Sequence, residues 1–150
     1  MFLVGSLAIV LASASTTAFP GGMIDVPRGC TAPAKISMVG DGFMGGIKCP
    51  KEGLDILVYG DLYTRRPCEA IDKKAPAAQR ESLEIPIPGG TSIFVCTLER
   101  KHSRTQAIIK EMMIDLGPAQ LVTEVRTPRQ AFVLLQIAMS FRAPSAEGSK

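Results

Sequence analysis

The chain has 150 residues, of which 46% are hydrophobic, and a formal net charge of +3 at pH 7. This hydrophobic share excludes an intrinsically disordered protein, and the length fits one globular domain that can bury a core. The weak positive charge is compatible with an anionic partner, but an ordinary protein surface is the default interpretation.

The first residues have the layout of a secretory signal peptide. An apolar run from Phe2 to Leu11 is followed by small residues as far as Ala18. The run is too short to span a bilayer, which takes about 20 apolar residues, and it predicts cleavage by signal peptidase. We expect cleavage after Ala18, with Ala14 as the alternative, so that residues 1–18 form the signal peptide. A buried N-terminal strand or helix of a cytosolic protein is the competing interpretation.

The rest of the chain is expected to form a single secreted globular domain over residues 19–142. A polar tail over residues 143–150 is expected to be disordered. The most apolar later run, from Ala131 to Phe141, is too short to cross a membrane. The sequence therefore predicts an extracellular protein without a membrane span.

All four cysteines follow the predicted cleavage region, at Cys30, Cys49, Cys68 and Cys96. An even number in a secreted chain predicts two disulfides and leaves their pairing open. A zinc site is the competing interpretation, but it needs clustered ligands, and these cysteines are widely spaced beside a single histidine, His102. We therefore expect no metal.

Taken in chain order, residues 19–35 are rich in glycine and proline and are expected to form an irregular lead-in. A short strand is expected over residues 43–49. Residues 54–66 are ambiguous, because their apolar positions recur at helical spacing but would also suit a strand. We expect a helix here, ending before Pro67.

Two strands are expected at residues 83–87 and 91–98, joined as a hairpin across a Pro-Gly-Gly sequence. A further strand is expected over residues 121–125. Thr127, followed by proline, is typical of a helix start, so a C-terminal helix is expected over residues 129–142. Together these elements predict an α+β domain, with one helix packed on an antiparallel sheet and a C-terminal helical extension.

Gly40, Gly42 and Gly45 match the G-x-G-x-x-G pattern of dinucleotide-binding loops. Such a loop must open a helix, so that the pyrophosphate lies at the helix N-terminus. Here the pattern leads instead into a short segment that ends at Pro50. We therefore expect no nucleotide cofactor, and no other cofactor is indicated.

Residues 82–87 (SLEIPI) contain a Glu-x-Pro-Ile sequence. On this segment the chain resembles secreted fungal ribonucleases of the guanyl-specific family and the ribonuclease-like effectors of plant-pathogenic fungi. The resemblance spans about residues 46–125 and implies the ribonuclease-like α+β fold. It also implies that Glu84 stands where the family has its general base, which takes the proton of the ribose 2′-hydroxyl. Shorter likenesses lie at residues 47–49, 92–95, 107–109 and 120–125.

The chain departs from this family where the other catalytic groups stand. Ser92 or Ile93 occupies the place of an arginine, and Lys110 or Glu111 occupies the place of the acid histidine. Ribonuclease chemistry needs a base, an acid and cations on the phosphate. Only the base is in place, so the resemblance implies a catalytically degenerate, non-enzymatic member.

We therefore expect a secreted effector-type binding protein of a plant-pathogenic fungus, a non-catalytic ribonuclease-like scaffold acting on a host protein or RNA outside or inside host cells. One alternative is an active secreted ribonuclease that uses Glu84, His102 and a basic residue such as Arg100 or Lys101. His102, however, lies in a turn rich in lysine and arginine, which favours a solvated surface side chain. The other alternative is an unrelated small secreted binding or inhibitory protein.

Overall fold

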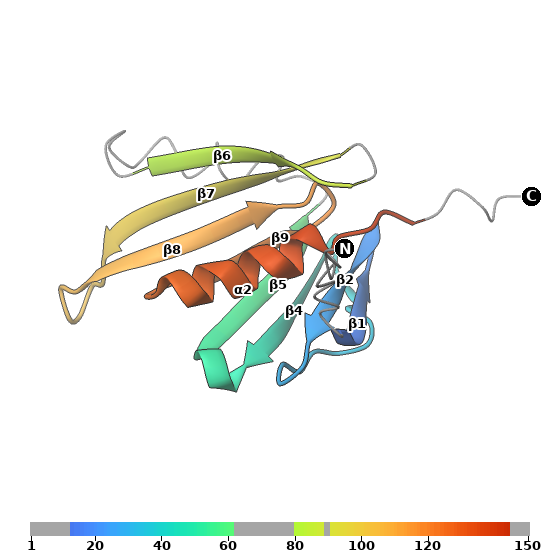
Figure 1. The fold of residues 1–150 in the computed structure, drawn as a ribbon, viewed down its shortest axis with the longest axis horizontal. Helices are drawn as coiled ribbons and strands as arrows, with labels where there is room; N and C mark the ends of the chain where they lie inside the picture. Colours follow the sequence, from blue (N-terminus) through green and yellow to red (C-terminus); the bar gives the residue numbers. More distant parts are fainter. Residues whose placement is uncertain (1–12, 62–79, 89–90, 145–150) are drawn as a thin grey trace, which may run out of the picture.

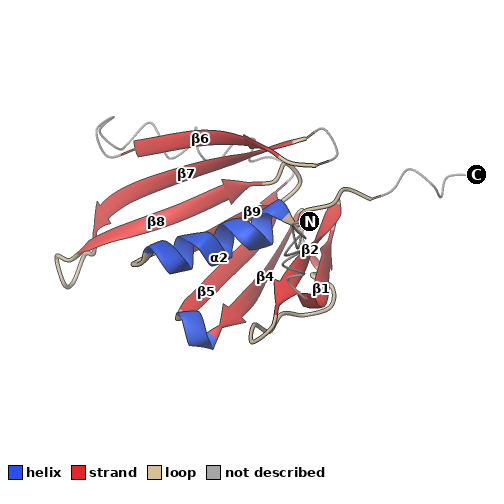
Figure 2. Ribbon diagram, viewed as in Figure 1, coloured by secondary structure: helices blue, strands red, loops and turns tan. Residues whose placement is uncertain are grey.

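The computed structural model describes residues 13–61, 80–88 and 91–144. These residues form a seven-stranded antiparallel sheet, a separate two-stranded hairpin and one α-helix (Figures 1 and 2). The predicted α+β, ribonuclease-like fold is therefore wrong, because the described chain is mainly β. The C-terminal helix is not an extension added to a helix-on-sheet core; it is itself the helix that packs on the sheet.

The strands of the sheet lie in the order β3-β4-β5-β9-β8-β7-β6. Their bounds are β3 (Met38–Val39), β4 (Gly42–Cys49), β5 (Leu54–Asp61), β6 (Arg80–Pro86), β7 (Ser92–Lys101), β8 (Ile108–Asp115) and β9 (Gln120–Glu124). The separate hairpin consists of β1 (Ser13–Phe19) and β2 (Gly22–Pro27), a 3-10 turn η1 (Pro50–Glu52) links β4 to β5, and the helix is α2 (Pro128–Met139).

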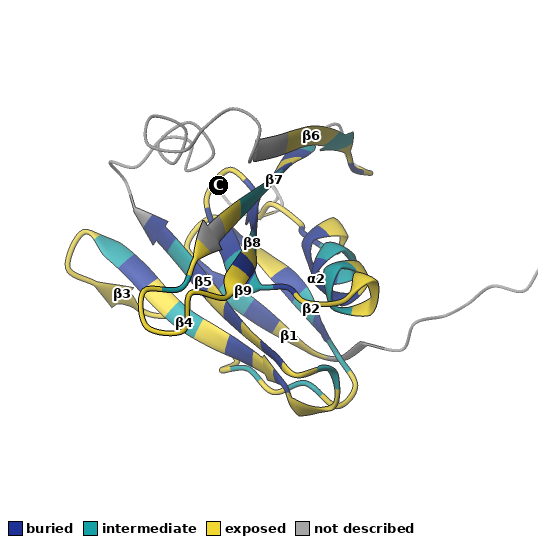
Figure 3. Cartoon of the chain, turned by 90° about the vertical axis from the view of Figure 1, so that its left-hand side faces the viewer, coloured by how far each residue is buried: buried dark blue, intermediate teal, exposed yellow. Residues whose placement is uncertain are grey.

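The helix predicted over residues 54–66 is wrong in its described part, which is strand β5. Leu54, Ile56 and Val58 are buried, and the residues between them are exposed. This alternation has the period of a strand with one face in the core. It is visible as bands along β4 and β5 in Figure 3. Pairing with β4 on one side and β9 on the other overrides the helical spacing, and residues 62–66 lie outside the described residues.

Two predicted elements with strong local signals are confirmed. The hairpin on either side of the Pro-Gly-Gly sequence is β6–β7, in which Ile85 pairs with Ile93. The helix begins where the Thr-Pro sequence predicts, with Thr127 as its N-cap, and its last residue is Met139. The Thr127 side chain accepts a hydrogen bond from the backbone N–H of Gln130, and the Gln130 side chain reaches back to the cap residue. This reciprocal capping box satisfies backbone donors that a helix start leaves without partners.

The irregular lead-in predicted over residues 19–35 is wrong in its first part, which contains strand β2 and the end of β1. The two strands turn at Gly21, whose φ of 96° lies in the left-handed region that favours glycine. β1 also includes Ser13–Ala18, the last part of the expected signal peptide, while residues 1–12 lie outside the described residues.

One face of the sheet carries the core. Helix α2 lies across this face, with Val133, Leu134, Ile137 and Ala138 buried (Figure 1). The β1–β2 hairpin packs beside the C-terminal half of the helix, where the ring of Phe19 stacks between those of Phe43 and Phe141, with centroids 5.8 and 6.1 Å apart. The hairpin, the helix and the sheet therefore share a single apolar core.

A disulfide joins Cys30 to Cys49, with Cα atoms 4.2 Å apart, and ties the segment after β2 to the end of β4. Cys96 is also in a disulfide, and Cys68 lies outside the described residues. The predicted use of cysteines in bridges is thus confirmed for Cys30, Cys49 and Cys96. Within the described ranges, no helix has the length and apolar character that crossing a bilayer requires.

Candidate functional site

A groove with a volume of about 840 Å³ lies between the end of the β7–β8 hairpin and the start of α2. It forms because β7 and β8 continue past the point where the helix begins (Figure 1). Its lining comprises Thr97, Glu99, His102, Thr105, Ala107, Ile108, Ile109, Lys110, Met112, Glu124, Val125, Arg126, Thr127, Pro128 and Ala131.

The apolar part of the lining comes from three elements. Met112 on β8 and Val125 after β9 are buried, and Ala131 on α2 is half-buried. Ile108 lies at the first position of β8 and is 69% exposed. An exposed aliphatic side chain beside a buried apolar floor is a feature that a ligand can cover with a gain in free energy.

Charged side chains of both signs line the same groove. Glu99 on β7 is directly opposite Lys110 on β8 in the strand register, and both are exposed. At the other side, the Glu124 carboxylate accepts a hydrogen bond from Arg126 Nε at 2.8 Å. The groove therefore has two carboxylates and two cations around an apolar floor. Negative and positive side chains are nearly balanced.

The helix wall of the groove is held by a set of hydrogen bonds. Gln130 Oε1 accepts hydrogen bonds from the backbone N–H of Arg126 at 2.7 Å and of Thr127 at 3.2 Å. Gln130 Nε2 donates to the Glu52 carbonyl in η1 at 2.8 Å, and Arg129 donates to both oxygens of the Glu52 carboxylate. The carboxylate raises the pKa of the Arg129 guanidinium. The wall is therefore fixed to the turn before β5, and backbone donors at the helix start are already used.

His102 belongs to the turn at the open end of the groove. Its Nδ1 accepts hydrogen bonds from the backbone N–H groups of Arg104 and Thr105, both at 3.3 Å. Its backbone pairs with Gln106 and Ala107 across the turn. The ring is half-buried, so it is less solvated than the charged sequence around it predicts. The imidazole thus shapes the β7–β8 turn.

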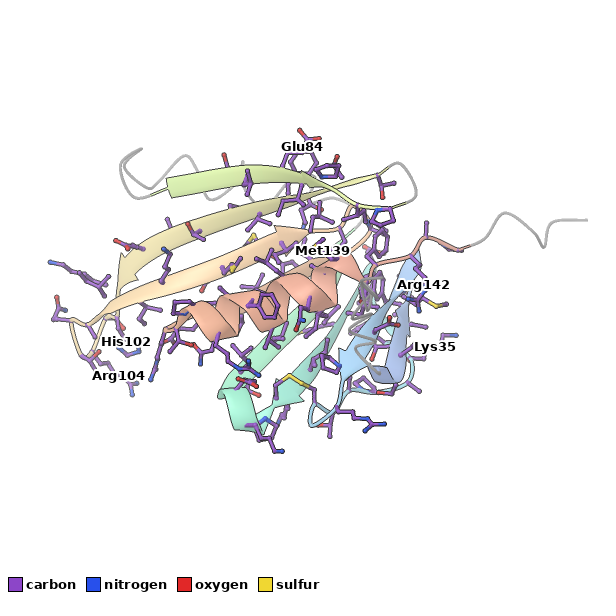
Figure 4. All side chains as sticks on the ribbon, in the orientation of Figure 1. Lys35, Glu84, His102, Arg104, Met139 and Arg142 are labelled. Atoms are coloured by element: carbon purple, nitrogen blue, oxygen red, sulfur yellow. A yellow bond between two sulfur atoms is a disulfide. The ribbon has the colours of Figure 1, made fainter. Side chains whose placement is uncertain are left out.

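The structure does not bring together the three residues of the ribonuclease alternative. Glu84 is exposed on β6 and pairs with Phe94. From Phe94 to His102 the chain is extended along β7, which at about 3.4 Å per residue separates the two positions by about 27 Å. Figure 4 shows Glu84 and His102 at distant parts of the sheet. Arg100 lies on β7 opposite Ile109, near His102 in the chain and six residues along the strand from Phe94, the partner of Glu84.

Glu84 instead ends a row of residues on the sheet face that points away from α2. Strand pairing places Met44, Tyr59, Gln120, Asp115, Phe94 and Glu84 in register across six strands. Asp115 and Gln120 are buried, and Gln120 Oε1 has no hydrogen-bond partner among the described residues. Burial, with the nearby carboxylates of Glu111 and Asp115, raises the pKa of Tyr59.

This row has no cation beside Glu84. Phosphoryl transfer requires positive groups that stabilise the negative charge on the phosphate. The five residues in register with Glu84 instead include the Asp115 carboxylate and the Tyr59 phenol. The row of described residues in register with Glu84 therefore lacks the cation that a phosphate site requires.

The sequence contained no signal for the groove itself. Its charged residues come from β7, from β8 and from the connection between β9 and α2, and each stands in an ordinary polar position of its own segment. Gly42 and Gly45 of the glycine pattern lie on strand β4, whose first residue follows a turn and not a helix start.

In the part of the chain that the structure describes, no cluster of His, Cys, Asp or Glu side chains is placed to hold a metal ion. Comparisons of the chain with protein-family models, with curated proteins and with solved structures find no match.

Proposed function

We propose that this chain is a secreted binding protein whose groove between the β7–β8 hairpin and α2 takes an extended peptide segment of a partner protein. The observation that carries the proposal is the composition of the groove, an apolar floor with separate charges of both signs. Its volume of about 840 Å³ lies within the range of about 300–1,000 Å³ that is typical of ligand sites.

A peptide suits this composition because it supplies apolar and charged side chains along one extended backbone. Among the described residues, neither Glu99 nor Lys110 has an ion-pair partner. A partner with a basic and an acidic side chain at the matching spacing would pair with both. Ile108 would be covered at the same time, and burial of its exposed apolar surface would contribute to affinity.

RNA fits the groove less well than a protein does. Sequence-independent binding of nucleic acid rests on clustered lysine and arginine side chains that displace counterions from the phosphates. Here the carboxylates of Glu99 and Glu124 lie in the same lining as Lys110 and Arg126. Glu124 already pairs with Arg126, so that cation is partly neutralised.

Secretion rests on the N-terminal sequence pattern. The Cys30–Cys49 disulfide is compatible with an oxidising, extracellular location. The more specific role, an effector of a plant-pathogenic fungus, rests on the sequence resemblance alone. It remains a prediction, and the ribonuclease-like scaffold is no longer part of it.

The proposal is tested by selecting a phage-displayed library of random peptides against the purified protein. Peptides that bind should lose at least about tenfold in affinity, or about 1.4 kcal/mol, with Ile108→Asp or Lys110→Glu. Phe132→Asp is the matched control, because Phe132 is an exposed apolar residue of α2 outside the groove lining. Peptides that bind all three variants equally would refute the groove as the site. Tight binding of a single-stranded RNA that weakens steeply with salt and is lost with Lys110→Glu would identify RNA as the partner instead.

A further inference from the structure

We propose that signal peptidase cuts this chain between Ala14 and Ser15, and that Ser15–Ala18 is a structural part of the mature protein. The inference rests on the secretion that the proposed function includes. It replaces the cleavage after Ala18 that the sequence pattern favours. The water that hydrolyses the amide bond gives a carboxylate on Ala14 and a new α-amino group on Ser15.

The regular pairing of β1 with β2 begins at Ser15. From Ser15, opposite Val26, to Phe19, opposite Gly22, every residue of β1 has its partner in β2. The register shifts between Ser13 and Ser15, so the ladder is irregular at Ala14 itself. The boundary of the regular strand thus coincides with the proposed end of the signal peptide.

The residues between the two cleavage sites are built into the fold. Thr17 is fully buried, and its hydroxyl donates to the Pro33 carbonyl at 3.0 Å. The backbone of Ala18 donates to Ala34 and accepts from Ile36, at 3.0 and 2.8 Å. Residues 15–18 therefore connect β2 on one side to the segment after it on the other.

Cleavage after Ala18 would remove these contacts and expose the core. Ile24 and Val26 on β2 are fully buried, and β2 would lose the strand with which it pairs. The new N-terminal residue would be Phe19, whose side chain packs between two other aromatic rings and would lose the strand that precedes it. Ser15, by contrast, is exposed, and its amino group would remain solvated.

The sequence before each bond satisfies the small-residue rule, so the pattern admits a cut after Ala14 although it favours one after Ala18. Ala12-Ser13-Ala14 has alanine at both positions that the peptidase reads, and Thr16-Thr17-Ala18 has threonine and alanine. The structure favours the first, because only that cut leaves β1 able to pair.

The test is to secrete the full chain from a yeast host and to sequence the N-terminus of the protein in the medium. We expect Ser15 as the first residue. A product in the medium that begins at Phe19 would overturn the inference while leaving secretion intact. A chain that stays in the cell and begins at Met1 would overturn the secretion on which it rests, and so would also contradict the proposed function.

A matched pair of variants sharpens this result. A leucine is too large for the position before the cut, so Ala14→Leu should abolish the product that begins at Ser15. Ala18→Leu, the same change at the rejected site, should leave the N-terminal residue unchanged. The opposite pattern would place the cut after Ala18. Because the readout is the first residue of the product, it does not depend on how stably either variant folds.

Discussion

The two ends of the sheet differ in how far they are covered. At one end, the β1–β2 hairpin and the C-terminal half of α2 cover the sheet, and Phe19, Phe43 and Phe141 stack in a closed core. At the other end, β7 and β8 extend past the helix, and Ile108 remains 69% exposed above the groove.

If the groove binds a peptide as proposed, stability and binding are carried by separate residues. Substitutions at the packed end should reduce the free energy of unfolding and leave the groove intact. Substitutions of exposed residues at the open end should change binding with little effect on unfolding, because surface positions seldom contribute more than about 0.5 kcal/mol.

The largest effect is expected from Ile24→Ala. Ile24 is fully buried between the hairpin and the rest of the core, so its loss leaves a cavity. We expect the free energy of unfolding to fall by about 2–5 kcal/mol, near the top of that range. Ile108→Ala, the same kind of truncation at the open end, is the control and should cost much less. Equal losses of unfolding free energy in the two variants, measured by urea denaturation, would show that the two ends contribute alike to stability.

Removal of the Cys30–Cys49 disulfide should have the next largest effect. The bridge spans 19 positions in the sequence. Closing a loop of this size stabilises a protein by about 3 kcal/mol, chiefly by restricting the unfolded chain. The double variant Cys30→Ala/Cys49→Ala should show this loss in denaturant unfolding when it is compared with the oxidised wild-type protein. An unchanged denaturation midpoint would mean that other contacts keep the segment after β2 attached to the end of β4 without the bridge.

A smaller loss is expected at the helix start, where the two regions meet. Thr127→Ala removes the oxygen that accepts from the Gln130 N–H at 3.2 Å. Loss of an N-cap side chain costs about 1 kcal/mol. Thr127→Ser keeps the oxygen and should retain most of the stability. The thermal midpoints of the two variants measure the difference, and an equal drop would indicate that the methyl group, not the cap, matters.

The smallest effect should appear only at alkaline pH, in the middle of the sheet. The pKa of Tyr59 is raised by burial and by Glu111 and Asp115, so the folded protein holds the phenolic proton more tightly than the unfolded chain does. The stability that this provides is complete below the ordinary tyrosine value of about 10 and is lost as pH rises through the higher folded value.

Tyr59→Phe should therefore flatten the decline of the thermal midpoint above about pH 10, because the variant has no phenol to ionise at this position. The same two proteins compared near pH 8 provide the baseline for the loss of the hydroxyl itself. A wild-type curve with the same alkaline slope as the variant would show that Tyr59 does not couple to folding.

Sequence reasoning succeeded where the signal was local. The Pro-Gly-Gly sequence between apolar runs identified the β6–β7 hairpin, and Thr127 before a proline identified the start of α2. Both features depend on the backbone preferences of a few neighbouring residues. They were therefore readable without knowing what packs against them.

It failed where distant residues decide the structure. Leu54, Leu57 and Val58 suggested a helix, but β9 pairs with this segment from far along the chain and makes it a central strand. Ser13–Ala18 has the small residues of a signal-peptide end, and its pairing with β2 could not be predicted from that run alone. The groove was missed for the same reason, since Glu99, Lys110 and Arg126 meet only in the folded chain.

The pairing of β5 with β9 also bears on how the chain folds. Every other neighbouring pair in the sheet joins strands that follow one another in the described chain, whereas Val58 on β5 pairs with Leu121 on β9. Hairpins form in about 1–10 μs, but closing a loop of this length must first overcome a larger entropy cost. We therefore expect β3–β5 and β6–β9 to form early as two separate sets of hairpins and to pair with each other late. Stopped-flow refolding should then show a rate limited by the pairing of β5 with β9.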